Sequence, residues 1–268
     1  MRKCLLVADQ CVRAVHHALA DFIVDPSRAL PSDASLWLTR PGKNTGDPGI
    51  RFPDIVVARM TSHPCEFEID VLDGRIVWTR PTDPEALKSG NPDLLVYPAI
   101  RIGKGIAVGN GRQTADIDPD GGGSPVSILE RGLADWSYEP DAPIHTPRIS
   151  GCILPSGRSG VAVVRRGDEG EAFRSYFEFP RLAGRGRLIS TYAGENAEPL
   201  PPFEGEPREV SFGEATARET AEAFYASLGP DERGGPDFRV AVACLFADPE
   251  DLARFEIHII NRDERTRP

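Results

Sequence analysis

A hairpin signal at Asp73-Gly74 constrains the fold of this chain more than any other feature. The dipeptide stands between two runs of alternating polar and apolar residues in the stretch CEFEIDVLDGRIVWTR. Asp-Gly favours a tight two-residue turn because the central residues of such a turn take positive φ angles. The sequence therefore predicts two adjacent antiparallel strands joined at this point.

Short runs rich in strand-forming residues recur along the rest of the chain, separated by loops that contain Pro and Gly. The charged loop 167–171 joins two of them, which predicts another hairpin. These short connections predict mainly antiparallel sheets, because antiparallel neighbours can be joined by tight turns. The further predicted strands are SLWLTR (35–40), DIVVARM (54–60), LLVYPAIRI (94–102), GIAVGN (105–110), ISGCIL (149–154), GVAVVRR (160–166), FRSYFEF (173–179), RLISTY (187–192), FRVAVACLF (238–246) and FEIHIIN (255–261).

Helices are predicted near both ends of the chain and between the strands. Apolar residues at helical spacing indicate a helix at 11–22, and Ser211 with Glu214 has the spacing of a capping box that opens a helix to Leu228. Shorter helices are predicted at 84–89 and 125–134, with a helical turn at 249–253. The fold class is therefore α+β, with either two packed antiparallel sheets covered by helices or one sheet with helices on a single face. No internal repeat or linker divides the chain, so we expect one domain.

Composition excludes several classes of protein. Of 268 residues, 40% are hydrophobic and 27% are charged, and the longest apolar runs (54–60 and 238–247) are too short to span a membrane. The 41 acidic residues outnumber the 31 basic ones, and the formal net charge of −10 would repel nucleic acid. Five cysteines without a close pair, and an N-terminus without a signal-peptide core, indicate a cytoplasmic location. We therefore expect a small-molecule substrate, no nucleic acid and no membrane, with a homo-oligomer as an open option.

A search for general catalytic and metal-binding motifs does not identify a site in this sequence. The glycine-rich stretches 105–111 and 184–187 lack the strand-to-helix spacing of a nucleotide-binding loop, so a role in loop geometry is the simpler interpretation. His16 and His17 are adjacent, whereas two metal ligands on a helix should lie one turn apart. His258 fits an ordinary strand residue, and the Ser, His and Asp residues are too scattered to name a catalytic triad.

Three segments are unusual because polar residues are dense where a plain strand would alternate: 94–117, 138–151 and 189–207. They carry a Tyr-bearing strand followed by NGRQTAD, then TPRI, then TYAG and FEGEP. These motifs, in this order, resemble the archaeal-type IMP cyclohydrolase family and its bacterial IMP cyclohydrolase-like branch. The resemblance runs from about Asn91 to Pro207.

The resemblance implies a four-layer αββα sandwich, similar to that of N-terminal-nucleophile hydrolases but without use of a terminal nucleophile. One IMP cyclohydrolase-like domain would span residues 1–268, with 1–90 diverged, 91–207 best matched and 208–268 supplying a closing helix and strands. The family reaction is the dehydrative ring closure of formamido-imidazole-carboxamide ribonucleotide to IMP in purine biosynthesis, by attack of an amide nitrogen on a carbonyl. No metal or redox cofactor is expected.

The resemblance also implies site residues. Tyr97 would donate a proton or orient the substrate, Glu139 would act as acid or base, and Arg148 would bind an anion or a carbonyl oxygen, as the reaction requires. Each also has an ordinary interpretation, as a strand aromatic, a solvated loop carboxylate and a surface ion pair respectively. The residues expected to bind substrate, or in some cases only to order a loop, are Arg101, Asn110, Gln113, Thr114, Asp116, Thr146, Thr191, Tyr192, Glu195, Glu204 and Glu206.

The N-terminal motifs of the family, Y-x-GR and SR-x-x-x-NR, are not recognisable in this chain. Arg40, Lys43 and Arg51 are candidates to replace the cations of these motifs, and Pro98 replaces the Asn that normally follows the family tyrosine. A phosphate-bearing nucleotide needs charged anchors, which these motifs would supply. Three functions therefore stay open: an IMP cyclohydrolase, a cyclase or ring-opening hydrolase repurposed for a specialised biosynthetic pathway, and a non-catalytic ligand-binding protein.

Overall fold

The computed structural model describes residues 55–60, 67–72, 74–81, 95–180, 185–192, 201–211, 216–227, 239–248 and 250–262. The predicted helices at 11–22 and 84–89, the predicted strand at 35–40 and the cations Arg40, Lys43 and Arg51 lie outside these residues.

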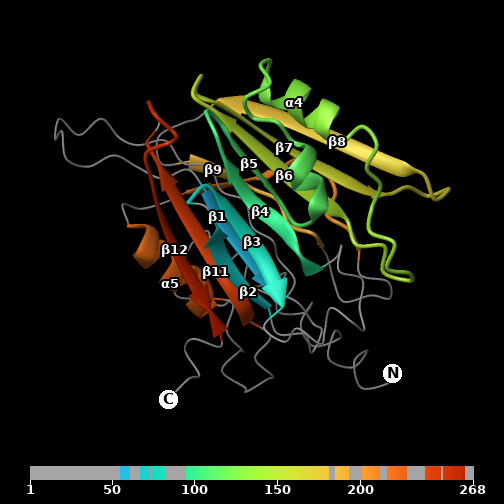
Figure 1. Cartoon of the computed structure of the whole chain (residues 1–268). Coiled ribbons are helices and arrows are strands. Elements are labelled where there is room, and N and C mark those ends of the chain that lie inside the picture. The colour runs from blue at the N-terminus through green and yellow to red at the C-terminus, as the bar shows by residue number, and fades with distance from the viewer. Residues whose placement is uncertain are drawn as a thin grey trace.

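A seven-stranded antiparallel sheet is the largest element of the described fold (Figure 1). Its strands lie in sequence order, each hydrogen-bonded to the next. A turn at Gly74, with φ 74°, joins the first two strands, and the loop 167–171 joins the last two, so both predicted hairpins are confirmed. The strands are β2 (Phe67–Leu72), β3 (Ile76–Pro81), β4 (Tyr97–Ile102), β5 (Ile106–Gly109), β6 (Arg148–Leu154), β7 (Arg158–Arg166) and β8 (Ala172–Pro180).

A second antiparallel sheet joins segments from the two halves of the chain. It contains β1 (Ile55–Met60), β11 (Arg239–Ala247) and β12 (Phe255–Asn261), in the order β1-β11-β12. β9 (Arg185–Leu188) and β10 (Arg208–Ser211) form a separate two-stranded antiparallel sheet. β10 was not expected from the sequence, because its four residues are too few to show a clear alternation.

Helices pack on both sheets. α4 (Pro125–Gly132) packs on β6, β7 and β8, and α5 (Ala217–Ser227) packs on the second sheet (Figure 1). The start of α4 is well specified, since the Ser124 side chain accepts a hydrogen bond from the Ser127 N–H and Pro125 stands in the first turn, where no N–H is required. Within the described part of the chain, no helix is long and apolar enough to cross a membrane.

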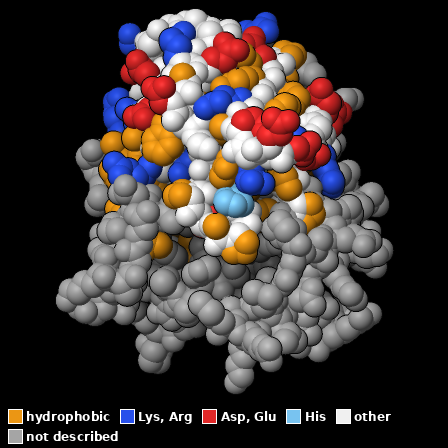
Figure 2. Space-filling model, turned by 90° about the vertical axis from the view of Figure 1, so that its right-hand side faces the viewer, with side chains coloured by type: hydrophobic (Ala, Val, Ile, Leu, Met, Phe, Trp, Pro, Cys, Tyr) orange, Lys and Arg blue, Asp and Glu red, His pale blue; other side chains and the backbone are white. Residues whose placement is uncertain are grey.

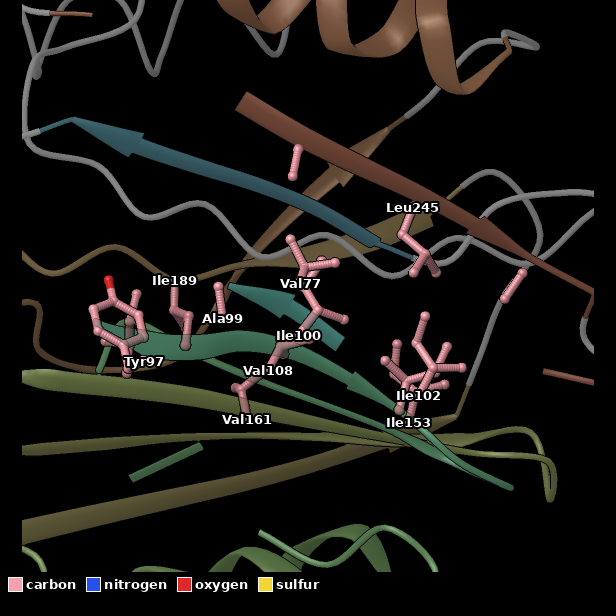
Figure 3. Close-up of a cluster of buried hydrophobic side chains, with 14 of the residues drawn as sticks. Val77, Tyr97, Ala99, Ile100, Ile102, Val108, Ile153, Val161, Ile189 and Leu245 are labelled. Carbon is pink, nitrogen blue, oxygen red and sulfur yellow. The ribbon is translucent and has the colours of Figure 1, made fainter. Parts of the chain in front are cut away.

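The main core lies between the seven-stranded and three-stranded sheets. Figure 3 shows side chains such as Ile100 and Val161 on one side of this core, with Leu245 of β11 on the other. A second apolar cluster, which includes Leu129 and Cys152, fills the space between α4 and the opposite face of the large sheet. The packing order is therefore α4, seven-stranded sheet, three-stranded sheet and α5. An α+β fold with mainly antiparallel sheets is confirmed.

α5 begins later than predicted. Ser211 lies in β10, and the capping box is formed instead by Thr216 and Glu219. The Thr216 N–H donates to Glu219 Oε2 (2.9 Å), and the Glu219 N–H donates to Thr216 Oγ1 (3.2 Å). The prediction was wrong because the sequence SFGEATARE contains the capping-box spacing twice, and the pairing of β10 with β9 takes the first copy into a strand.

Candidate active site

Arg148 is the centre of a buried polar cluster at one end of the seven-stranded sheet. It is the first residue of β6, where only 6% of its surface is exposed. β4 also begins at this end, with Tyr97, and the antiparallel strand β5 ends between them at Gly109. The strand ends therefore bring segments together that lie far apart in the sequence.

The guanidinium of Arg148 is held by three hydrogen bonds and by an aromatic ring. Nε donates to the Ser137 carbonyl (2.8 Å), while Nη1 donates to Gln113 Oε1 (3.0 Å) and to Glu139 Oε1 (3.2 Å). The ring of Trp136 lies 4.9 Å from the guanidinium carbon, which is a cation–π distance. All the hydrogen bonds from Arg148 to described residues come from Nε and Nη1. Nη2 is therefore the guanidinium nitrogen that can donate to a ligand.

Glu139 forms a buried ion pair with Arg148. The side chains are 12% and 7% exposed, respectively. Burial lowers the pKa of Arg148, because removal from water disfavours the charged form, and electrostatic interaction with Glu139 is the largest effect that opposes this shift. Removing two charges from water is costly and is seldom needed for stability alone, so such a pair is a candidate functional feature.

Gly111 leaves room for this ion pair. A Cβ at this position would lie 2.5 Å from Arg148 Nη1, 2.6 Å from Gln113 Oε1 and 3.2 Å from Glu139 Oε1. Its φ is −172°, which any residue can adopt, so the requirement for glycine is steric. The backbone after β5 therefore forms one wall of the cluster.

Asn110 and Gln113 connect the turn after β5 to β6. The Asn110 side chain donates to the Pro147 carbonyl (2.9 Å), and its Oδ1 accepts from the Ile149 N–H (2.8 Å) and from Gln113 Nε2 (3.0 Å). Gln113 lies in η1 (Arg112–Asp116), a 3-10 helix, and is completely buried. Its amide is thereby oriented with Oε1 toward Arg148, so Gln113 positions the arginine from inside the protein.

A second chain of hydrogen bonds links Tyr192, Thr146 and Asp141. Thr146 Oγ1 donates to Asp141 Oδ2 and lies 2.7 Å from Tyr192 Oη. Because the only hydroxyl proton of Thr146 is directed to the carboxylate, the Tyr192 hydroxyl must be the donor in the second contact. The Glu139 N–H donates to the Thr146 carbonyl (2.9 Å), which ties this chain to the ion pair.

Tyr97 lies on the core side of the same sheet end. It is 1% exposed and packs in the core cluster, where Figure 3 shows it near Ile189. The register of β3 with β4 shifts between Val77 and Trp78, and this irregularity lets both Tyr97 and Ile100 line the core. Glu139, by contrast, contacts the arginine directly.

The other predicted substrate-binding residues are spread over a wider area. Arg101 donates to the carbonyls of Ala115 and Ile117 and so fixes the C-terminal end of η1. Asp116 accepts from the Trp136 indole (2.8 Å), which connects it to the ring beneath Arg148. The remaining residues are Thr114, which is buried and donates to Gly111; Thr191, which is buried; Glu204, which is exposed and pairs with Arg165; and Glu206, which is exposed. Glu195 lies outside the described residues.

Trp136, Ser137 and Asp141 contribute to the cluster but were not predicted. Trp136 and Ser137 contact Arg148, and Asp141 acts on it electrostatically. Asp141 lies within the polar segment 138–151, so the density of polar residues there was a usable signal. Trp136 precedes that segment, and nothing local in the sequence distinguishes it from a core aromatic.

Charges of both signs lie side by side on the surface. Figure 2 shows acidic, basic and apolar side chains interspersed over the described part of one face. This part of the face therefore presents no extended basic area of the kind that binds a nucleic acid.

The fold and the cluster define an α+β protein with a buried arginine–glutamate pair at the end of an antiparallel sheet. A family model described as IMP cyclohydrolase-like protein matches residues 62–234. The chain therefore belongs to the IMP cyclohydrolase-like family, and the match extends on both sides of the segment that first showed the resemblance. No curated protein matches the chain.

Proposed function

We propose that this chain catalyses an IMP cyclohydrolase-like ring closure, in which an amide nitrogen attacks a carbonyl carbon and water is lost. Membership of the family supports this class of reaction. The observation that carries the proposal is the buried pair of Arg148 and Glu139, which supplies a cation and a carboxylate at one place. The reaction needs both, because negative charge develops on the carbonyl oxygen and protons must move.

Arg148 is proposed to stabilise the oxygen under attack. As the amide nitrogen bonds to the carbonyl carbon, the C=O π electrons move to oxygen and give a tetrahedral adduct. Nε and Nη1 are held by the protein, which fixes the guanidinium and leaves Nη2 to donate to that oxygen. A fixed donor of this kind needs no reorganisation when the charge develops.

Glu139 is proposed to carry the protons. Its carboxylate takes a proton from the attacking nitrogen and returns it to the oxygen of the adduct. The C–O bond then breaks and hydroxide leaves, while the carboxylate removes the second proton from the nitrogen and passes it to the hydroxide, which gives water and the C=N bond of the ring. The ion pair with Arg148 holds the carboxylate beside the guanidinium, so the proposed proton acceptor lies next to the proposed oxygen ligand.

Tyr97 and Tyr192 are proposed to orient the substrate and the loop above it. The core position of Tyr97 suits a wall that holds the reacting groups in contact. The hydrogen-bonded chain from Tyr192 through Thr146 to Asp141 holds the backbone that carries Glu139.

The four-layer αββα sandwich of N-terminal-nucleophile hydrolases is the architecture that we infer for the complete chain. The order α4, seven-stranded sheet, three-stranded sheet and α5 supports it. The family match includes none of the three strands of the smaller sheet, β1, β11 and β12. The support for this layer is therefore its packing against the seven-stranded sheet.

The preferred substrate is proposed to be smaller than the purine precursor or to lack its phosphate. A phosphate monoester carries about two negative charges near neutral pH, whereas the one arginine in the described cluster is already balanced by Glu139. The net charge of −10 also disfavours a polyanionic ligand. This chain would then be a cyclase repurposed from purine biosynthesis.

Substitution of Glu139 tests the proposed chemistry. Glu139→Gln keeps the shape and a hydrogen bond to Arg148 but cannot accept a proton, so we expect turnover to fall by roughly two to four powers of ten. Glu256→Gln is the matched control, because this exposed residue of β12 lies in the other sheet. Equal activity of the two variants would remove Glu139 from the mechanism.

Turnover of the purine precursor separates the substrate proposals. We expect the wild-type protein to form IMP poorly from formamido-imidazole-carboxamide ribonucleotide, as measured by product absorbance. Efficient IMP formation would overturn the proposal of a smaller substrate while leaving the roles of Arg148 and Glu139 in place.

A further inference from the structure

β8 is an edge strand with an open side. It is the last strand of the seven-stranded sheet (Figure 1), and all nine of its residues pair with β7 in an unbroken register. Within the described part of the chain, no strand pairs with its other side. Outward-facing N–H and C=O groups of this side are available to a further strand.

Several of the features that usually protect an edge strand are missing from β8. It contains no lysine, its register shows no bulge, and its one proline, Pro180, is the final residue. Phe173 is 45% exposed, which is unusual for a large apolar side chain. Long edges without such protection are ready to pair with another chain.

The sequence of β8 is complementary to itself around Tyr176. In an antiparallel pair centred on this residue, Tyr176 lies opposite its own copy, Phe173 lies opposite Phe179, and Arg174 lies opposite Glu178. Aromatic pairs and opposite charges are both favourable when they face each other across antiparallel strands. The partner that best fits this edge is therefore a second copy of the same strand.

We propose that two copies of the protein associate through β8, antiparallel about a two-fold axis at Tyr176, and form one continuous sheet. Each copy uses the same surface, as a closed two-fold dimer requires. α4 packs on the same strand, so the two helices flank the axis and enlarge the interface. The exposed Phe173 becomes covered by the Phe179 of the other copy.

The charged residues on β8 are already fixed in place. Arg174 donates to the carbonyls of Ala134 (3.0 Å) and Trp136 (2.6 Å), and Glu178 accepts from the Val126 N–H (3.4 Å). Because these side chains are held in the single chain, pairing with another copy orders few additional groups.

Charge substitutions at the axis test the proposed dimer. Light scattering after gel filtration should give twice the mass of one chain for the wild type. Tyr176→Lys alone and Tyr176→Glu alone should each be monomeric, since two like charges would face each other, whereas an equimolar mixture should recover dimers. Circular dichroism checks that each variant is folded. A monomeric wild type, or dimers that both charged variants retain, would overturn the proposal.

A cysteine at the axis provides a second test that does not require a charged variant to fold. Directly opposite Cα atoms in an antiparallel pair are about 4.5–5.5 Å apart, which a disulfide can bridge. Tyr176→Cys should therefore give disulfide-linked dimers under mild oxidation. Ser175→Cys is the matched control, because its copy lies about 8 Å away. Equal cross-linking of both variants, or none above the wild type for Tyr176→Cys, would contradict the two-fold axis.

Discussion

Gly111 is the residue whose replacement should disturb the site most selectively. The added Cβ of Gly111→Ala would meet Arg148 Nη1, Gln113 Oε1 and Glu139 Oε1, all of which are held by buried hydrogen bonds. We expect turnover to fall by at least about tenfold, because a small misplacement of a reacting group is costly. Steady-state kinetics would measure this loss, and the melting temperature would show that the fold persists.

Gly74→Ala is the reciprocal control for that variant. Gly74 has a φ of 74° but no atom within 4 Å of the position of a Cβ, so alanine there causes backbone strain without a clash. We expect a loss of stability of about 1 kcal/mol and unchanged turnover. Equal turnover for Gly111→Ala and the wild type would show that Arg148 is not held as the structure indicates.

Ser159 carries a polar atom that the core does not need. Its hydroxyl is buried and has no hydrogen-bond partner among the residues that the structure describes. Because an unsatisfied buried group costs about 1–3 kcal/mol, we expect Ser159→Ala to leave the free energy of unfolding unchanged or to increase it. Thr79→Val should instead decrease it, since the buried Thr79 hydroxyl donates to the Leu95 carbonyl (3.0 Å). Denaturant titration compares the two, and a marked loss from Ser159→Ala would reveal a partner for that hydroxyl.

The sequence pointed to some residues of the Arg148 cluster, Gln113 among them, and missed others. The resemblance pointed to Glu139 and Arg148, which are in direct contact. Trp136 and Asp141 were missed, because their positions depend on how the segment before β6 folds back over the strand ends. Such a path is set by tertiary contacts that no local pattern records.

The start of α5 offers a test at the level of a single element. Thr216→Ala removes the side-chain acceptor that holds the Glu219 N–H, so we expect a loss of about 1 kcal/mol in the free energy of unfolding. Ser211→Ala should have little effect on the helix, because Ser211 lies in β10. Thermal unfolding of both variants measures the difference, and the reverse order of effects would place the cap at Ser211.

The same cap has a definite pH dependence. Hydrogen bonds from the Thr216 backbone N–H and hydroxyl lower the pKa of Glu219 from its usual value of 4.5. A carboxylate with a lowered pKa stabilises the folded state above its unfolded pKa, and this contribution is lost as the pH falls through the folded pKa. The contribution of the Glu219 carboxylate to stability should therefore be complete at neutral pH and absent in strong acid. Glu219→Gln should accordingly lower the free energy of unfolding at neutral pH but not in strong acid.

Elements that form between neighbours in the sequence were predicted well. The hairpin around Gly74 and the hairpin from β7 to β8 follow from turn residues and alternation. Turn residues and alternation could not predict the pairing of β1 with β11, because these strands are distant in the sequence and either could have joined the large sheet. The two capping-box patterns before α5 could not be distinguished either, because the choice between them depends on the pairing of β10 with β9.

At the scale of the whole molecule, Cys152 and Cys244 report on two different layers. Cys152 packs between the seven-stranded sheet and α4. Cys244 alternates along β11 with the core residues Ala243 and Leu245, so it faces the side of the sheet covered by α5. Burial raises the pKa of Cys152 to about 12 and raises that of Cys244 well above its usual value. Both thiols are therefore protonated in the folded state and unreactive until the protein opens.

Thiol labelling can thus test whether the layers form one domain. If they unfold as a single cooperative unit, the two cysteines should require the same free energy of opening, in the range of about 5–15 kcal/mol for a whole domain, with the same dependence on urea. Peptide mass spectrometry after timed alkylation measures each site separately, and a short peptide gives the intrinsic rate. Since Cys244 lies outside the family match at 62–234, faster labelling there would mean that β11, β12 and α5 open independently of the layer that carries Arg148.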